Sequence, residues 1–339
     1  MELNSTITND KQALSVFLRI IAVLTIGSVT LVGLIANVIV VLAIAGDRKM
    51  RKSSMNLLLF NLAVADFLAL VTYTVIWFPS AFYGTPAWML PVSFCPIDKY
   101  LNVTTLAVSQ FTYIAICVER YIAIVHPMQA KSLISGKRIL CALTFIWIFA
   151  LFLQLIYYIG WTYPQYISKN VADIKHNTDH CVDPIFYEYG FLIWVWIDFD
   201  LFVVYILPGL LSVILYQRIC ATLSTRAKLL QESPKKKRDY DADRLHSFFY
   251  ICYTPWTVYM MWGATVNTNF KLPFKVWMTV ALIMQICNTA NPFVYTLYSV
   301  TLEGGSKICS HVVQSHKYKI CLFKQEDLPI MKSIFRVPC

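Results

Sequence analysis

Charged residues are scarce in this sequence. Asp, Glu, Lys and Arg make up 14% of its 339 residues, whereas 58% are hydrophobic and the mean hydropathy is +0.57. Soluble domains contain about 25% charged residues. The composition therefore excludes an ordinary soluble protein and indicates a membrane protein, in which no soluble domain of useful size remains between the apolar segments.

Histidine is also rare, and none lies in the middle of an apolar segment. The six histidines are in loops or near segment ends. Metal-dependent hydrolases that work within a membrane need clusters of His and acidic side chains there. We therefore expect no enzyme activity, no catalytic residue and no metal site. His176 and His180 lie close together, but two imidazoles are too few ligands, and we interpret them as part of a solvated loop.

Internal repeats are lacking as well. Transporters usually contain repeated halves and helices that are broken at mid-membrane. The apolar segments here show no repeat, their number is odd, and they carry a single central acid, Asp66. A seven-span transporter is therefore the less favoured alternative.

What the sequence does contain is apolar runs of the length that crosses a bilayer, about 20 residues or more. These runs predict an all-α membrane protein built as a seven-helix bundle. They cover residues 15–45, 54–80, 96–125, 138–161, 188–219, 245–267 and 274–300.

The distribution of Lys and Arg predicts the orientation of the bundle. Most of the 29 basic residues fall on one side if the N-terminus is outside, as the positive-inside rule requires. The net charge of +10 therefore reflects membrane topology rather than binding to nucleic acid. We expect a plasma-membrane protein with an extracellular segment at 1–14, a membrane domain at 15–300 and a cytoplasmic tail at 301–339. A glycosylation sequon at Asn4 agrees with this orientation.

The last run contains Asn291, Pro292 and Tyr295. A proline inside a helix removes one backbone hydrogen bond and kinks the helix, and in lipid the freed groups need partners from neighbouring helices. Such a kink suggests a helix that has to move. Other runs carry their own landmarks, in order: Gly33 to Asn37, Asn61 to Asp66, Glu119 to Tyr121 followed by His126 and Pro127, Trp147, Pro208 with Tyr216, and Phe249 with Cys252 and Pro255.

This ordered set resembles the rhodopsin-like (class A) G-protein-coupled receptors, over residues 15 to about 310. The resemblance implies a receptor that binds an extracellular ligand and activates a heterotrimeric G protein, with arrestin and membrane lipid as further partners. Cys95 and Cys181 both face the oxidising side and are the natural disulfide pair.

Asp66 lies at mid-membrane, where an acidic group is rarely without a function. Asn37, Ser109, Asn288 and Asn291 are polar residues that could converge on it. The resemblance implies a hydrated pocket for an allosteric sodium ion, the one ion we expect. The alternative is a neutral, hydrogen-bonded structural acid.

The resemblance also implies a coupling site at the cytoplasmic side. Arg120 pairs with Glu119 at rest and moves toward Tyr216 and Tyr295 when the receptor is active. Met128 could insert into the G protein, although a lipid-facing Met remains an equal alternative. The other residues we assign to activation and coupling are Tyr121, Pro127, Phe249, Pro255 and Pro292.

The outer halves of the runs are acidic and aromatic, which favours a cationic and partly aromatic ligand. The alternative is that the acids are solvated and the aromatics form a membrane belt. The residues assigned to ligand binding are Asp98, Asn102, Asp198, Asp200, Tyr253, Trp256, Tyr259 and Gln285. The stretch 119–131 is similar to neuropeptide receptors, so we expect a peptide. A small non-peptide ligand is the alternative, but Asn102 replaces the Asp of amine receptors, and Gln285 sits near the retinal-bearing Lys of opsins.

Three positions depart from the family pattern. Tyr253 replaces the usual Trp and adds a hydroxyl that needs a partner. Gln110 stands where an apolar residue normally packs. Gly304 and Gly305 follow the last run in place of an aromatic and basic start to a short helix.

Overall fold

The computed structural model describes residues 16–85, 87–162, 190–229, 252–258 and 274–309. Within these residues the regular structure is entirely helical. The long helices are α2 (Val16–Gly46), α4 (Ser54–Tyr83), α5 (Cys95–Val125), α7 (Gly136–Thr162), α11 (Gly190–Leu201), α12 (Leu207–Leu229) and α14 (Phe274–Cys309). Short elements are α3 (Arg48–Arg51), η1 (Val92–Phe94) and α6 (Pro127–Leu133), and residues 252–258 are also helical.

The fifth apolar run forms one continuous span with a local widening. A π-helical turn, η2 (Phe202–Ile206), joins α11 to α12 without a break. Single π turns insert an extra residue into a helix and are frequent at functional sites. This span and the four before it are long and apolar enough to cross a membrane: Val16–Gly46, Ser54–Tyr83, Cys95–Val125, Gly136–Ile159 and Val195–Thr225.

The last two runs are described in part. Residues 252–258 form helix inside the sixth run, and the rest of that run lies outside the described residues. The seventh run forms α14, which contains Pro292 and continues past residue 300 to Cys309. It therefore passes through Gly304 and Gly305 without ending, although glycine lowers helix propensity by about 1 kcal/mol.

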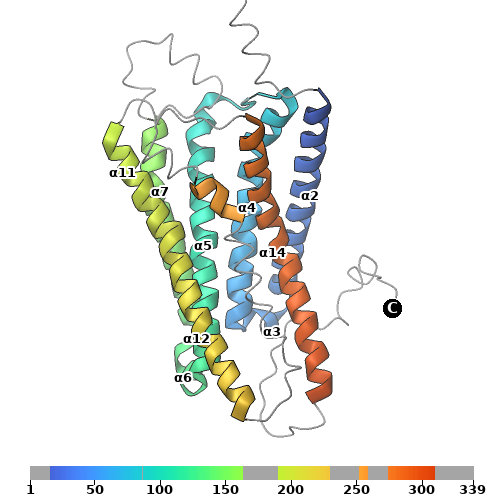
Figure 1. The fold of residues 1–339 in the computed structure, drawn as a ribbon, viewed down its shortest axis with the longest axis vertical. Coiled ribbons are helices and arrows are strands. Elements are labelled where there is room, and N and C mark those ends of the chain that lie inside the picture. The colour runs from blue at the N-terminus through green and yellow to red at the C-terminus, as the bar shows by residue number, and fades with distance from the viewer. Residues whose placement is uncertain (1–15, 86, 163–189, 230–251, 259–273, 310–339) are drawn as a thin grey trace, which may run out of the picture.

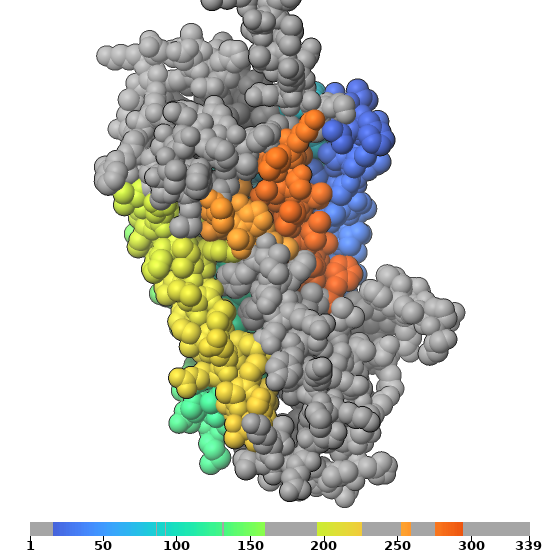
Figure 2. Space-filling model, viewed as in Figure 1, coloured from blue at the N-terminus to red at the C-terminus, as the bar shows by residue number. Residues whose placement is uncertain are grey.

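The long helices run side by side along the long axis of the molecule (Figure 1). Helix α5 begins at Cys95 at one end of this bundle, and we call that end the Cys95 end. The short helices α3 and α6 lie at the opposite end, near the last turn of α5, which we call the Arg120 end. Residues 252–258 lie between α12 and α14 (Figure 2).

Helix α4 occupies the middle of the packing. It contacts α2, α5, α7 and α14, and Leu58, Leu62 and Leu70 on it are fully buried. Helix α2 instead packs on one side only, and Phe17, Leu24 and other large apolar residues stay exposed. In a membrane-spanning chain these exposed side chains face the lipid.

Candidate functional site

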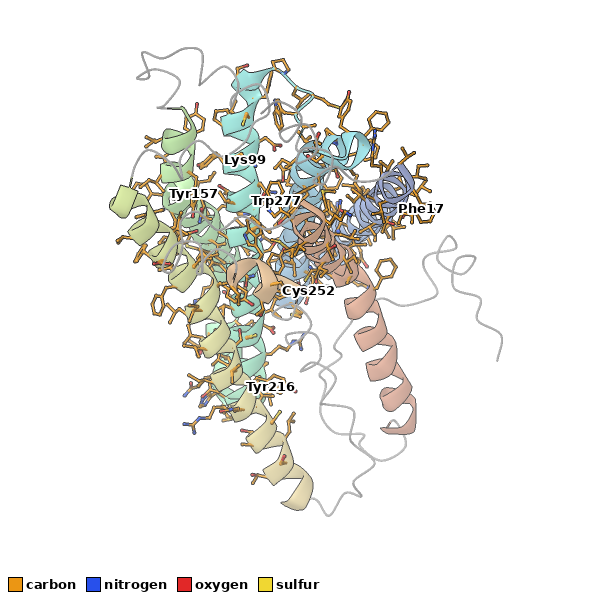
Figure 3. The ribbon with its side chains drawn as sticks, turned by 45° about the horizontal axis from the view of Figure 1, so that its top comes forward. Phe17, Lys99, Tyr157, Tyr216, Cys252 and Trp277 are labelled. Atoms are coloured by element: carbon orange, nitrogen blue, oxygen red, sulfur yellow. The ribbon has the colours of Figure 1, made fainter. Side chains whose placement is uncertain are left out.

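A cavity of about 180 Å³ lies between the helices toward the Cys95 end. Lys99, Tyr157 and Trp277, which line it, lie toward the same end of the molecule, and Tyr216 lies far from them toward the Arg120 end (Figure 3). Every described span except α2 contributes to the lining. The lining residues are Tyr73, Ile76, Trp77, Lys99, Asn102, Val103, Leu106, Gln110, Gln154, Tyr157, Ile197, Asp200, Leu201, Val204, Tyr205, Tyr253, Trp256, Thr257, Trp277 and Met284.

Four of the residues assigned to ligand binding from the sequence line this cavity. They are Asn102, Asp200, Tyr253 and Trp256. The amide of Asn102 is already used, because its Nδ2 donates to Thr72 Oγ1 at 3.0 Å. These four residues come from three spans, so their convergence depends on how the helices pack.

Three other assigned residues do not line the cavity. Gln285 is buried against α2, where its amide donates to the hydroxyl of Thr30. Asp98 and Asp198 each have one carboxylate oxygen that is buried without a hydrogen-bond partner, but both lie outside the lining. Tyr259 lies outside the described residues.

Asp200 is the acidic side chain in the cavity wall. It is 9% exposed and accepts two hydrogen bonds from α7. Gln154 Nε2 donates to Oδ1 at 2.7 Å, and the hydroxyl of Tyr157 donates to Oδ2 at 3.1 Å. These bonds fix the carboxylate in position and join the fourth span to the fifth.

Gln110 and Tyr253 also line the cavity, and both depart from the family pattern. The Tyr253 hydroxyl donates to Asn288 Oδ1 on α14 at 3.0 Å, so the extra hydroxyl has a partner. Gln110 is 3% exposed, and its Oε1 has no hydrogen-bond partner. Gln110 and Tyr253 therefore add polar groups to the cavity lining besides Asp200.

A second polar cluster surrounds Asp66, which is fully buried. Ser109 Oγ donates to Oδ1 at 3.0 Å and Asn291 Nδ2 donates to Oδ2 at 2.6 Å. Asn291 in turn accepts a hydrogen bond from the hydroxyl of Tyr113. The structure thus brings together residues of α4, α5 and α14 around one acid.

Asn37 and Asn288, which were also expected to converge on Asp66, hydrogen-bond to each other and not to the acid. Asn37 Nδ2 donates to the backbone oxygens of Gly33 and Asn288, at 2.9 and 3.3 Å. The side chain of Asn288 accepts a hydrogen bond from Tyr253, which lines the cavity. Its Nδ2 is buried and has no partner.

The Arg120 end carries the residues assigned to coupling. Arg120 Nε lies 3.5 Å from Glu119 Oε2, which is an ion-pair distance, and that oxygen accepts no hydrogen bond. The hydroxyl of Tyr121 lies 3.3 Å from Nε2 of His126. Met128, on α6, is 92% exposed. Pro127 begins α6.

Several assigned positions cannot be placed in contacts. Phe249, Cys181 and Asn4 lie outside the described residues, as does the side chain of Tyr295. Cys95 is disulfide-bonded, and Cys181 remains the predicted partner. Pro255 is exposed and Pro292 is buried within α14. Tyr216 lies on α12.

Comparison with known proteins decides the family. Residues 36–295 match the family model described as 7 transmembrane receptor (rhodopsin family). The chain belongs to this family. The receptor is 31% identical to neuropeptide receptor 15 of Caenorhabditis elegans over 291 residues, which is 80% of this chain and 84% of that protein.

Two further relatives are more distant or shorter in overlap. The receptor is 24% identical to galanin receptor type 1 of Rattus norvegicus over 310 residues, covering 89% of this chain and 83% of the relative. It is 35% identical to the allatostatin-A receptor of Bombyx mori over 122 residues, 36% of this chain and 33% of the relative. The predicted fold class, a seven-helix membrane bundle of the rhodopsin-like class, is therefore confirmed.

Sequence reasoning missed much of the cavity wall. Gln154 and Tyr157 were not assigned, although they are polar residues three positions apart in an otherwise apolar span and so share a helix face. That spacing could have revealed them. Nothing in the sequence distinguishes Tyr73 or Met284, on the other hand, from ordinary buried residues.

Proposed function

We propose that the receptor lies in the plasma membrane with its Cys95 end outside, binds an extracellular peptide there, and activates a heterotrimeric G protein at the Arg120 end. The observation that carries this proposal is that α14 makes polar contacts both with the cavity and with Asp66. Tyr253 lines the cavity and bonds to Asn288 on α14, and the same helix carries Asn291, which bonds to Asp66.

The orientation is supported by the distribution of basic residues. Arg48, Lys49, Arg51 and Lys52 in and after α3 lie at the Arg120 end, as positive-inside topology requires for a cytoplasmic face. Residues 1–14 are then extracellular, and the chain from 301 onward is cytoplasmic.

A peptide ligand is supported by the relatives and by the cavity. One relative carries the name neuropeptide receptor and another allatostatin-A receptor. The cavity combines aromatic side chains with one buried acid, whereas Asn102 offers no charge for a simple amine. A small non-peptide ligand is the alternative, since the cavity is compact.

An allosteric sodium ion fits the residues around Asp66. Sodium is a hard cation that prefers oxygen ligands, and the cluster offers the carboxylate of Asp66 and the hydroxyl of Ser109. A carboxylate has about four lone-pair sites, so the two hydrogen bonds it accepts leave lone pairs that an ion could use. The ion would stabilise the resting packing of α4, α5 and α14.

At the Arg120 end we propose that the G protein contacts Met128 and the segment after Arg120. Met128 projects almost fully exposed from α6, and an exposed thioether suits an adaptable apolar contact. Arrestin would compete for the same face, and membrane lipid surrounds the spans. We infer a receptor and not an enzyme, because the family to which the chain belongs is a receptor family.

The decisive experiment is a screen of amidated neuropeptides on cells that express the receptor, with calcium and cyclic AMP measured together. A hit is then tested for nucleotide exchange on purified G protein in membranes. Dose-dependent exchange that requires the receptor supports the proposal. A complete absence of exchange with every peptide that binds would overturn it.

A further inference from the structure

We propose that the cavity binds the guanidinium group of an arginine side chain in the ligand, through Asp200 and Gln154. This inference rests on the proposed function in one respect only, namely that the ligand is a peptide. We call the Asp200 carboxylate and Gln154 Oε1 the acceptor pair.

The first argument concerns charge. Asp200 is 9% exposed, and both groups that donate to it, Gln154 Nε2 and the Tyr157 hydroxyl, are neutral. In the part of the chain that the structure describes, Asp200 takes part in no ion pair. An acid at this depth of a membrane protein normally faces a cation or water. A positive group in the cavity would supply that partner.

The second argument concerns hydrogen-bond capacity. Gln154 is 1% exposed and its Nε2 is committed to Asp200, while its Oε1 is buried without a partner. An orphaned buried acceptor destabilises a structure until a donor reaches it. The Asp200 oxygens also have lone pairs to spare. Acceptors therefore outnumber donors at this point of the cavity wall.

The occupant must then combine positive charge with several N–H donors in one small group. A guanidinium group has five N–H donors in a planar fork, whereas an ammonium group is a compact, strongly hydrated point charge. One guanidinium edge can pair with Asp200 while another N–H reaches Gln154 Oε1. An ammonium group would satisfy the charge but would have to give up more of its hydration.

The third argument concerns the aromatic lining. Trp77 and Trp277 meet edge to face with their ring centroids 4.6 Å apart, and both line the cavity, as do Tyr157 and Trp256. Guanidinium groups are weakly hydrated and stack on aromatic faces. Lys99 lines the cavity too, so the arginine must approach on the Asp200 side and keep away from that amine.

The test uses the full-length receptor purified into lipid nanodiscs and pools of amidated tetrapeptides. One position is fixed as arginine in each pool, and the other positions are mixed. Matched pools carry lysine at the fixed position, or citrulline, which is a neutral urea of nearly the same shape. Binding is measured as a rise in the Tm of the receptor, because a ligand of the folded state raises Tm.

We expect at least one arginine pool to raise the Tm, its lysine counterpart to raise it less, and its citrulline counterpart to leave it unchanged. These comparisons need only the wild-type chain. Two variants then locate the site. Asp200→Asn should raise the apparent Kd of the active pool by more than about tenfold, and Gln154→Met should remove the preference for arginine over lysine.

Asp47→Asn is the matched control, because it removes the same charge from an exposed residue that lies outside the cavity lining. It should leave the Kd unchanged. The proposal is overturned if no arginine pool binds, if citrulline binds as well as arginine, or if Asp200→Asn binds as tightly as the wild type.

Nucleotide exchange separates this inference from the proposed function. Nucleotide exchange driven by a ligand without arginine would refute the arginine site and leave the signalling role intact. Binding of an arginine pool through Asp200, with no exchange for any bound peptide, would support the arginine site and refute the proposed signalling role.

Discussion

Two buried glutamines show how much the environment of a single residue decides. Gln110 is 3% exposed with its Oε1 unpartnered, whereas Gln285 is 1% exposed and donates to Thr30. The two side chains have the same chemistry and similar burial. Only one of them has its hydrogen-bonding capacity used by the protein.

We therefore predict opposite effects of the same substitution. Gln110→Met should raise the stability of the unliganded receptor by about 1 kcal/mol, because it removes an orphaned acceptor and keeps the volume. Gln285→Met should lower it by about 1 kcal/mol, because Thr30 loses its donor. The Tm of each purified variant measures the difference, and shifts of the same sign would contradict the argument.

The other residue-scale prediction concerns Asp66. Asp66→Asn should abolish the sodium dependence of agonist affinity, because the neutral amide cannot provide the negative ligand that the cation needs. Agonist binding is measured in sodium and in choline buffers of equal ionic strength. A sodium effect of unchanged size in the variant would refute the sodium pocket. If the wild type shows no sodium effect at all, Asp66 is a structural acid.

At the scale of the helices, close packing around α2 depends on one glycine. A Cβ placed on Gly33 would lie 2.4 Å from Thr289 Oγ1 and 2.7 Å from Leu70 Cδ1, so it would collide with both α14 and α4. On Gly27, in the same helix, the nearest atom is Phe78 Cε2 at 3.7 Å, an ordinary contact. The two glycines thus form a matched pair.

Gly33→Ala should destabilise the receptor by about 1–3 kcal/mol, because an overpacked helix interface must shift. Gly27→Ala should be neutral, or stabilising by up to about 1 kcal/mol, because alanine favours the helix. Thermal unfolding of both variants in the same detergent provides the measurement. Equal stability of the two would show that α2 can move away from its neighbours freely.

The helices also show what sequence could and could not predict. Span positions followed from apolar length, so the run 96–125 closely matches α5 (Cys95–Val125). The extension of α14 to Cys309 was not predicted, because Gly304 and Gly305 are poor helix formers.

Hydrogen-bond partners on different helices were harder to predict than the span positions, because such pairing depends on how each helix is rotated and tilted. Four residues were expected around Asp66, namely Asn37, Ser109, Asn288 and Asn291, and two of them, Ser109 and Asn291, bond to it. That expectation came from family resemblance. Gln154 and Tyr157 around Asp200 had no such precedent, and the position of Gln285 toward Thr30 instead of the cavity could not be read from its spacing.

At the scale of the whole molecule, the cavity and the Arg120 end are far apart, yet they share helices. Span three carries Gln110 and Asn102 at the cavity, Ser109 at the Asp66 cluster, and Arg120 near its last turn. If ligand and G protein both bind through the packing of this helix, as we propose, each must affect the binding of the other by the same free energy.

Substitution of Arg120 tests that link, because Arg120 lies outside the cavity lining. It pairs with Glu119 at 3.5 Å in this structure, and we expect it to exchange partners when the inner ends of the spans separate. Arg120→Ala should give a folded receptor that reaches the surface and binds agonist with at most a modest change in affinity, but that activates G protein poorly. Arg48→Ala is the control, since it removes an exposed positive charge in α3 at the same end.

The measurement is agonist-stimulated nucleotide exchange in membranes with matched surface expression. Exchange by Arg120→Ala should fall far below that of Arg48→Ala, while saturation binding of agonist stays comparable in the two. Loss of binding together with exchange would instead place Arg120 in the folding of the receptor. Full exchange by Arg120→Ala would mean that this chain, despite its family landmarks, couples to its G protein without the charge at the end of span three.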